Sequence, residues 1–66
     1  MMRFDKSPSG YDVYHNGSEH PIGWLNETSY RSGLFCVIHN KLSEAEQKMP
    51  RRLFEAKDLI TKLARA

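Results

Sequence analysis

Apolar residues recur at steps of three and four between Pro50 and Ala66, which is the spacing of one face of an α-helix. The residues on this face are Leu53, Ala56, Leu59, Ile60, Leu63 and Ala64. A proline is well tolerated at the first helical position, because its missing N–H would have no intrahelical acceptor there. We therefore predict a C-terminal helix over residues 50–66 that buries its apolar face against the rest of the chain.

Upstream of this helix, three short apolar segments alternate with residues that are typical of turns. The segments are Tyr11–His15, Ile22–Leu25 and Leu34–Ile38, and the turn residues are Asn16, Gly17, Ser32 and Gly33. This pattern predicts an α+β fold, in which a three-stranded antiparallel meander packs against one C-terminal helix (β-β-β-α). The single small domain would span residues 11–66, and the polar segment 1–10 would form a flexible N-terminal arm.

The chain between the third strand and the helix carries the pattern of a capping box, Ser43 followed by Glu46. In this motif each of the two side chains accepts a hydrogen bond from the backbone N–H of the other residue. We expect a short helical turn over residues 44–49, ended by Pro50.

The period of two along a strand places Trp24 on the helix side of the sheet, where we expect it to be the largest piece of the core. The third strand is apolar at all five positions, so it needs cover on both faces. With Leu34, Cys36 and Ile38 toward the helix, an apolar surface remains on the other side. We interpret it as a protein-binding surface formed by Tyr14, Leu25, Phe35 and Val37, with Phe54 outside the apolar face of the helix. Alternatively, the N-terminal arm and the loop 27–33 fold over this side.

The chain has 66 residues and one cysteine, so it forms no internal disulfide and buries only a small core. We therefore expect support from a protein partner or from a second copy of the chain. No segment approaches the roughly 20 apolar residues of a membrane span, and residues 1–14 do not resemble a signal peptide. We expect a cytoplasmic protein that binds neither a membrane nor a small-molecule substrate.

Four side chains are of the types that zinc prefers: His15, His20, Cys36 and His39. Their spacing fits a site poorly, because Cys36 and His39 are an odd number of positions apart and point to opposite faces of a continuous strand. A catalytic cysteine requires a partly exposed, electropositive environment, whereas Cys36 lies in the most apolar segment. We predict no metal, no cofactor and no catalytic residue.

The segments Tyr11–Tyr14, Ile22–Leu25 and Phe54–Ala56 follow one another as two strands and part of the helix. Over residues 11–64 the chain resembles, in element order, the AP2-type domains and the integrase arm-binding domains, which insert a three-stranded sheet into the major groove of DNA. In this alternative the phosphate contacts would be Arg3, Lys6, Arg31 and Lys41. The strand region, however, also carries the carboxylates Asp12, Glu19 and Glu27, which repel phosphate.

The net charge of +2, from ten basic and eight acidic residues, is too balanced for a dedicated polyanion binder. The sequence therefore favours a non-catalytic protein-binding module of accessory or regulatory type, such as an inhibitor of a host machine encoded by a phage or another mobile element. It would use the open side of the sheet or the bare edge of the third strand, and a homodimer is one form of this interaction. Binding to duplex DNA is the alternative, and an enzyme is a distant third.

Overall fold

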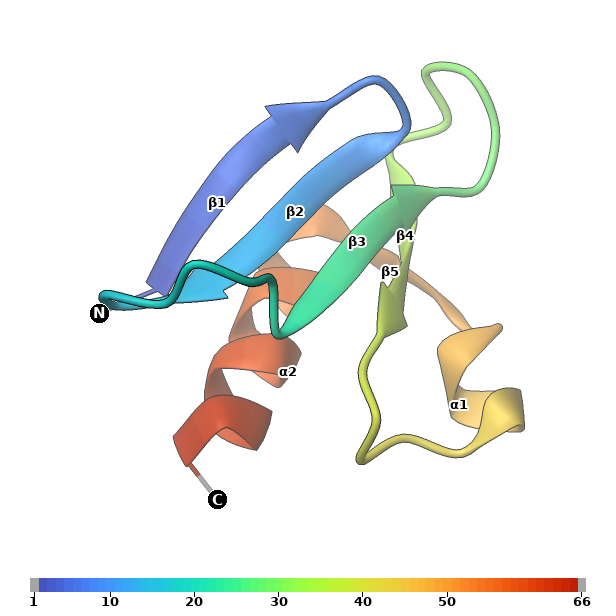
Figure 1. Ribbon diagram of the computed structural model, residues 1–66. Helices are drawn as coiled ribbons and strands as arrows, with labels where there is room; N and C mark the ends of the chain where they lie inside the picture. The colour runs from blue at the N-terminus through green and yellow to red at the C-terminus, as the bar shows by residue number, and fades with distance from the viewer. Residues whose placement is uncertain (1, 66) are drawn as a thin grey trace.

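The computed structural model describes residues 2–65, which form one antiparallel sheet and two helices (Figure 1). The elements are β1 (Met2–Ser7), β2 (Gly10–His15), β3 (Gly23–Glu27), β4 (Leu34–Ile38), α1 (Glu44–Gln47), β5 (Pro50–Arg52) and α2 (Leu53–Arg65). The strands lie in the order β1-β2-β3-β4-β5, so each strand pairs with its neighbours in sequence. The predicted α+β class and C-terminal helix are confirmed, but the sheet has five strands rather than three.

Both additional strands lie at edges of the sheet. The first, β1, comes from the segment that we expected to be a flexible arm, and it pairs with β2 along its whole length across a turn at Pro8 and Ser9. The second, β5, comes from the expected first turn of the helix and begins at Pro50, which suits an edge because it has no N–H to donate. The prediction of a bare β4 edge is therefore wrong, since β5 pairs with residues 34–36 of that strand.

Helix α1 is the expected capping-box turn. Ser43 Oγ accepts a hydrogen bond from the backbone N–H of Glu46 at 3.2 Å, and Glu46 Oε1 accepts one from the N–H of Ser43 at 3.0 Å. Gln47 at the end of this helix binds the sheet, because its Oε1 accepts a hydrogen bond from the N–H of His39 at 3.2 Å. The short helix is therefore tied to the chain directly after β4.

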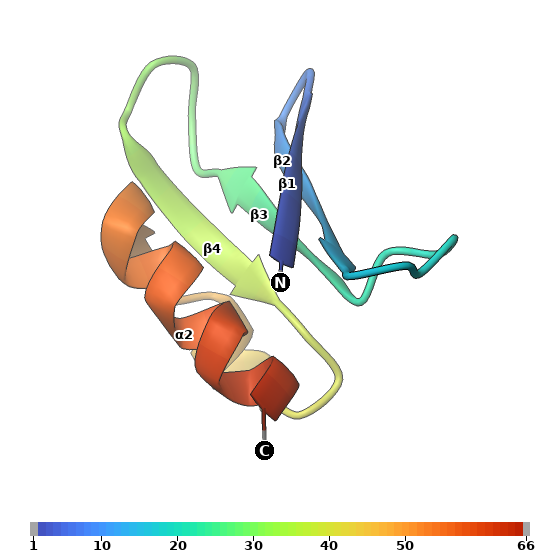
Figure 2. The ribbon, with the colours of Figure 1, turned by 90° about the vertical axis from the view of Figure 1, so that its left-hand side faces the viewer.

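Helix α2 packs along one face of the sheet, and within residues 2–65 no helix covers the other face (Figure 2). Its apolar side matches the sequence prediction, with Ala56 and Ile60 fully buried and Leu53 and Leu59 packed against the core. We call the side under α2 the covered face and the opposite side the open face. The core lies between α2 and the covered face and consists of Val13, Leu25, Phe35, Val37, Ala56 and Ile60.

The pairing register decides which side chains reach this core. Val13 lies opposite Gly23, and Tyr11 lies opposite Leu25. Because directly paired residues share a face of an antiparallel sheet, Leu25 joins Val13 under the helix and Trp24 does not. Our assignment of faces is therefore wrong for β3 and β4, and Trp24 is a residue of the open face with 40% of its surface exposed.

Gly23 shows why the covered face has this composition. A Cβ atom at this position would collide with the carbonyl oxygen of Ile38 and would lie 2.8 Å from Cδ1 of Ile60. The absence of a side chain thus lets the helix approach the sheet closely at Gly23, and no room is left there for an indole. None of the helices within residues 2–65 is long and apolar enough to cross a membrane.

Candidate functional site

Three of the five residues predicted to bind a protein lie in the core. Leu25 and Val37 are fully buried, and Phe35 is 5% exposed with its ring centroid 5.9 Å from that of Tyr11. Their predicted exposure on the open face is wrong, because the register of β3 and β4 turns them toward α2. They belong to the hydrophobic core under α2.

The open face carries the apolar residues that we had placed in the core. Trp24 pairs with Ile38, and the neighbouring positions of β4 on the same face are Cys36 and Leu34. Trp24 and Leu34 are among the exposed large apolar side chains, while Ile38 and Cys36 are half-buried. The structure thus forms a continuous apolar row across β3 and β4 on the open face.

Charged and polar side chains border this row on both sides. On the β1 and β2 side, Arg3 forms an ion pair with Asp5 at 3.1 Å, and its guanidinium lies 4.3 Å from the centroid of the Tyr14 ring. Asp12 lies directly opposite Trp24, and Arg52 lies beyond the row at the β5 edge. Neither Asp12 nor Arg52 makes an ion pair within residues 2–65. Tyr14, which pairs with Arg3, lies on the open face as predicted and is half-buried beneath the Arg3 guanidinium.

The loop between β3 and β4 holds its own shape instead of covering the open face. Hydrogen bonds hold the loop together. The N–H of Thr28 donates to the carbonyl of Leu34 at 2.9 Å, and the N–H of Gly33 donates to the Glu27 carboxylate at 2.9 Å. Tyr30 at its tip is 86% exposed. With β1 incorporated into the sheet, neither of the two segments that we considered as a cover buries Trp24.

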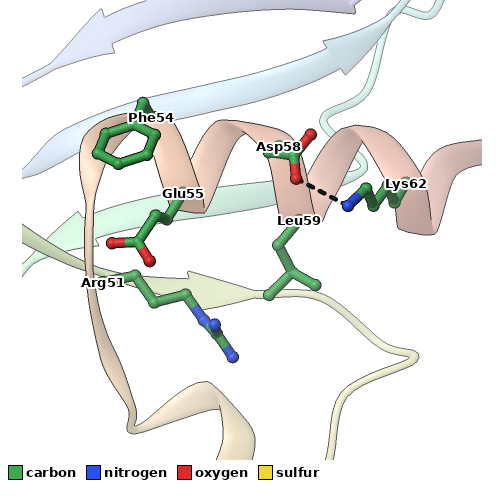
Figure 3. A pocket seen from close by; sticks show the side chains of 6 residues that line it. All are labelled: Arg51, Phe54, Glu55, Asp58, Leu59 and Lys62. Atoms are coloured by element: carbon green, nitrogen blue, oxygen red, sulfur yellow. Dashed lines mark ion pairs between the residues drawn. The ribbon is translucent and has the colours of Figure 1, made fainter.

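The fifth predicted residue, Phe54, lies elsewhere, at a groove along the outer side of α2 (Figure 3). The groove has a volume of about 500 Å³ and is lined by Arg51, Phe54, Glu55, Asp58, Leu59 and Lys62. Its charges are balanced, and Asp58 and Lys62 form an ion pair at 2.9 Å. Phe54 is 71% exposed at the rim. The groove contains no thiol, imidazole or hydroxyl group that would act as a nucleophile.

The four cations expected to contact DNA do not gather on one surface. Arg3 is on the open face, whereas Lys6 is on the covered face with its Nζ 4.8 Å from the centroid of Tyr11. Arg31 lies in the β3–β4 loop with a φ of 58°, and Lys41 follows β4 at the other end of that strand, where it donates to the carbonyl of Leu63 at 3.0 Å. The positions span two faces and both ends of the sheet.

The potential zinc ligands are also dispersed, and within residues 2–65 no group of three or more His, Cys, Asp or Glu side chains is placed to hold a metal ion. Cys36 is on the open face, while His39 is buried on the covered side. The Nδ1 atom of His39 accepts a hydrogen bond from the N–H of Lys41 at 3.1 Å. Burial lowers the pKa of His39, and the positive charge of Lys41 adds to this effect.

The site residues that sequence reasoning missed are Trp24, Leu34, Cys36 and Ile38, because the alternation of each strand leaves its two faces equivalent. The signal that distinguishes them is Gly23, whose lack of a side chain marks the face that a helix approaches. Comparisons of the chain with models of protein families, with curated proteins and with solved structures give no match.

Proposed function

We propose that this chain is a non-catalytic protein-binding module that uses the open face of its sheet. The observation that supports the proposal is the exposed apolar row around Trp24, which faces away from the core and has no cover within residues 2–65. Tryptophan is enriched among the residues that contribute most to protein interfaces, because it buries a large apolar area and still has one N–H to donate. An accessory or regulatory role remains the proposed type of activity.

The border of the row favours a protein rather than a nucleic acid. Asp5 and Asp12 lie directly opposite each other in β1 and β2, on the same face as Trp24. Only Asp5 is neutralised, by its ion pair with Arg3. A phosphate backbone laid on this face would meet the free Asp12 carboxylate, whereas a protein surface can offer a cation there and an anion near Arg52. The partner that fits is thus an apolar protein surface bordered by charges of both signs.

The alternative, insertion of the sheet into duplex DNA, receives less support. It requires cations on the strands of one face, and the four candidates lie on two faces and at both ends of the sheet. Titration of the protein with duplex DNA at two salt concentrations tests it. Binding with a steep salt dependence that Trp24→Ser abolishes would favour this alternative over the proposed function.

The proposal is tested by affinity capture with two matched variants. Trp24→Ser removes an aromatic ring from the open face, and Phe54→Ser removes one from the groove outside α2. We expect a discrete protein, or added copies of the chain itself, to bind the wild type and the Phe54→Ser variant and to be lost with Trp24→Ser. Light scattering over a concentration series identifies the case in which the partner is a second copy.

Two results would contradict the proposal. One is equal retention of every captured protein by Trp24→Ser and by the wild type, with both chains monomeric at all concentrations. The other is loss of the partner with Phe54→Ser alone, which would move the interaction to the groove. Circular dichroism of both variants must first show that each retains the fold.

A further inference from the structure

The side of α2 that faces β1 carries cations without matching carboxylates. Lys6 of β1 and Lys57 of α2 place their Nζ atoms 4.8 and 5.3 Å from the centroid of the same ring, that of Tyr11. The Nζ atom of Lys57 is also 5.1 Å from the centroid of Phe4. The ammonium groups of Lys6 and Lys57 therefore both lie close to the Tyr11 ring, the first from β1 and the second from α2.

The positive charge continues along the helix toward its C-terminus. Thr61 and Arg65 follow Lys57 at intervals of four residues, so the three share one side of α2. Thr61 and Arg65 line a hollow of about 100 Å³ together with Met2, His15 and Ala64. At 1.5 Å per residue, Lys57 and Arg65 are about 12 Å apart along the helix axis. We call the set Lys6, Lys57 and Arg65 the basic strip.

The two neighbouring carboxylates make their contacts outside the basic strip, and the Glu27 carboxylate keeps its negative charge. Glu27, on the same face of the sheet, accepts the hydrogen bond from the N–H of Gly33, and Asp58 pairs with Lys62 on the outer side of the helix. Within residues 2–65 none of the three cations of the strip makes an ion pair. The outer groove has balanced charges (Figure 3), whereas the basic strip consists of cations only, so the two sides of α2 differ.

We propose that the basic strip binds the phosphodiester backbone of a nucleic-acid strand. A row of unpaired cations along about 12 Å matches a ligand with regularly repeated negative charges, and a strand of B-form DNA carries one phosphate per about 3.4 Å of axis. The strip follows the line between an edge strand and a helix, which fits a narrow strand better than a flat anionic membrane. This surface is separate from the open face, so the inference does not depend on the proposed function.

The test is a titration of a labelled single-stranded oligonucleotide followed by fluorescence anisotropy, with a matched pair of variants. Lys57→Gln removes a charge from the strip, and Lys62→Gln removes one from the opposite side of the same helix, so both change the net charge equally. Loss of one phosphate contact should weaken binding about five- to tenfold at about 50 mM salt and make the salt slope shallower by about 0.7. We expect this effect for Lys57→Gln and little effect for Lys62→Gln.

Because Lys57 also packs on two aromatic rings, Arg65→Gln serves as a second variant that does not disturb them. It should weaken binding to a similar extent, and circular dichroism should show an unchanged fold for all three variants. Equal weakening by Lys57→Gln and Lys62→Gln would overturn the proposal, because it would show a response to net charge alone. Absence of oligonucleotide binding, with or without binding to phosphatidylserine vesicles, would also overturn it.

Discussion

Strands β2 to β4 carry similar numbers of apolar residues on the two faces of the sheet, yet only one face forms a core. On the covered face, Val13, Leu25 and Val37 are fully buried beneath α2. On the open face, the larger Trp24 remains 40% exposed beside Ile38. The difference shows that burial in this chain follows the register of the strands and the position of the helix, and does not follow the size or hydrophobicity of a residue.

The cause lies in the fit between helix and sheet. Medium-sized aliphatic residues and a glycine let α2 pack closely, with Cδ1 of Ile60 pointing at the backbone of Gly23. An indole at that place would push the helix away and leave space around it, at a cost in packing contacts. The open face has no such constraint, and it accommodates a tryptophan with 40% of its surface exposed.

The largest contrast between the faces is expected for two leucines. Leu25→Ala should lower the free energy of unfolding by about 2–5 kcal/mol, because it leaves a cavity in the core. Leu34→Ala removes the same atoms from an exposed position of the open face and should cost about 1 kcal/mol or less. Urea unfolding followed by circular dichroism measures both, and equal costs would mean that the two faces are not different.

A smaller loss is expected when the close approach of the helix is disturbed. Gly23→Ala should cost about 1–3 kcal/mol, because the added methyl group collides with the carbonyl of Ile38 and with the Ile60 side chain. Asn26→Ala, an exposed position of the same strand on the open face, is the control and should change the stability by about 0.5 kcal/mol or less. An unchanged melting temperature for Gly23→Ala would show that the helix packs elsewhere.

Trp24→Ala should have a still smaller effect on stability. Since only part of the indole is buried, we expect a loss of about 1–2 kcal/mol and an intact fold. A core tryptophan would instead cost about 3–5 kcal/mol, which would unfold much of so small a domain. Urea unfolding of Trp24→Ala and Leu25→Ala therefore compares directly how much each of these neighbouring residues of β3 contributes to the free energy of unfolding.

The smallest expected effect concerns His39, a buried polar side chain on the core side of the sheet. Its pKa is lowered in the folded state by burial and then by Lys41, so the unfolded chain binds more protons below the usual value of about 6.5. The contribution of His39 to the stability should thus be constant above about pH 7, and it should destabilise the fold as the pH drops from about 6.5 through the lowered value. His39→Gln should remove this dependence and His20→Gln should keep it, as measured by urea midpoints across the pH range.

The sequence predicted the elements of this fold better than their orientation. The apolar side of α2, the capping box at Ser43 and Glu46, and the strand Leu34–Ile38 all depend on local periodicity or local hydrogen bonds, and each is present. The faces of β3 and β4 depend on which residue pairs with Val13, a non-local property that periodicity leaves undetermined. The predicted site residues were misplaced for the same reason.

The two edge strands show a second limit of local reasoning. Arg3, Asp5 and Lys6 make β1 look like a solvated arm, although Met2 and Phe4, which alternate with Arg3 and Asp5, pack against the core. Pro50 is equally suited to begin a helix or an edge strand. It begins strand β5 here, because Arg51 pairs with Phe35 of β4. In both cases the structure of the segment depends on the strand with which it pairs, β2 for β1 and β4 for β5, and not on its own residues alone.

The most direct test of the account is the solvent accessibility of Trp24, which is the only tryptophan of the chain. Its fluorescence is measured at a dilution where light scattering gives the monomer mass, with acrylamide and iodide as quenchers. The account predicts the emission of a partly solvated indole that both quenchers reach in the folded protein. A blue-shifted emission that becomes accessible only after unfolding in urea would place Trp24 in the core and contradict both the assignment of the open face and the proposed function.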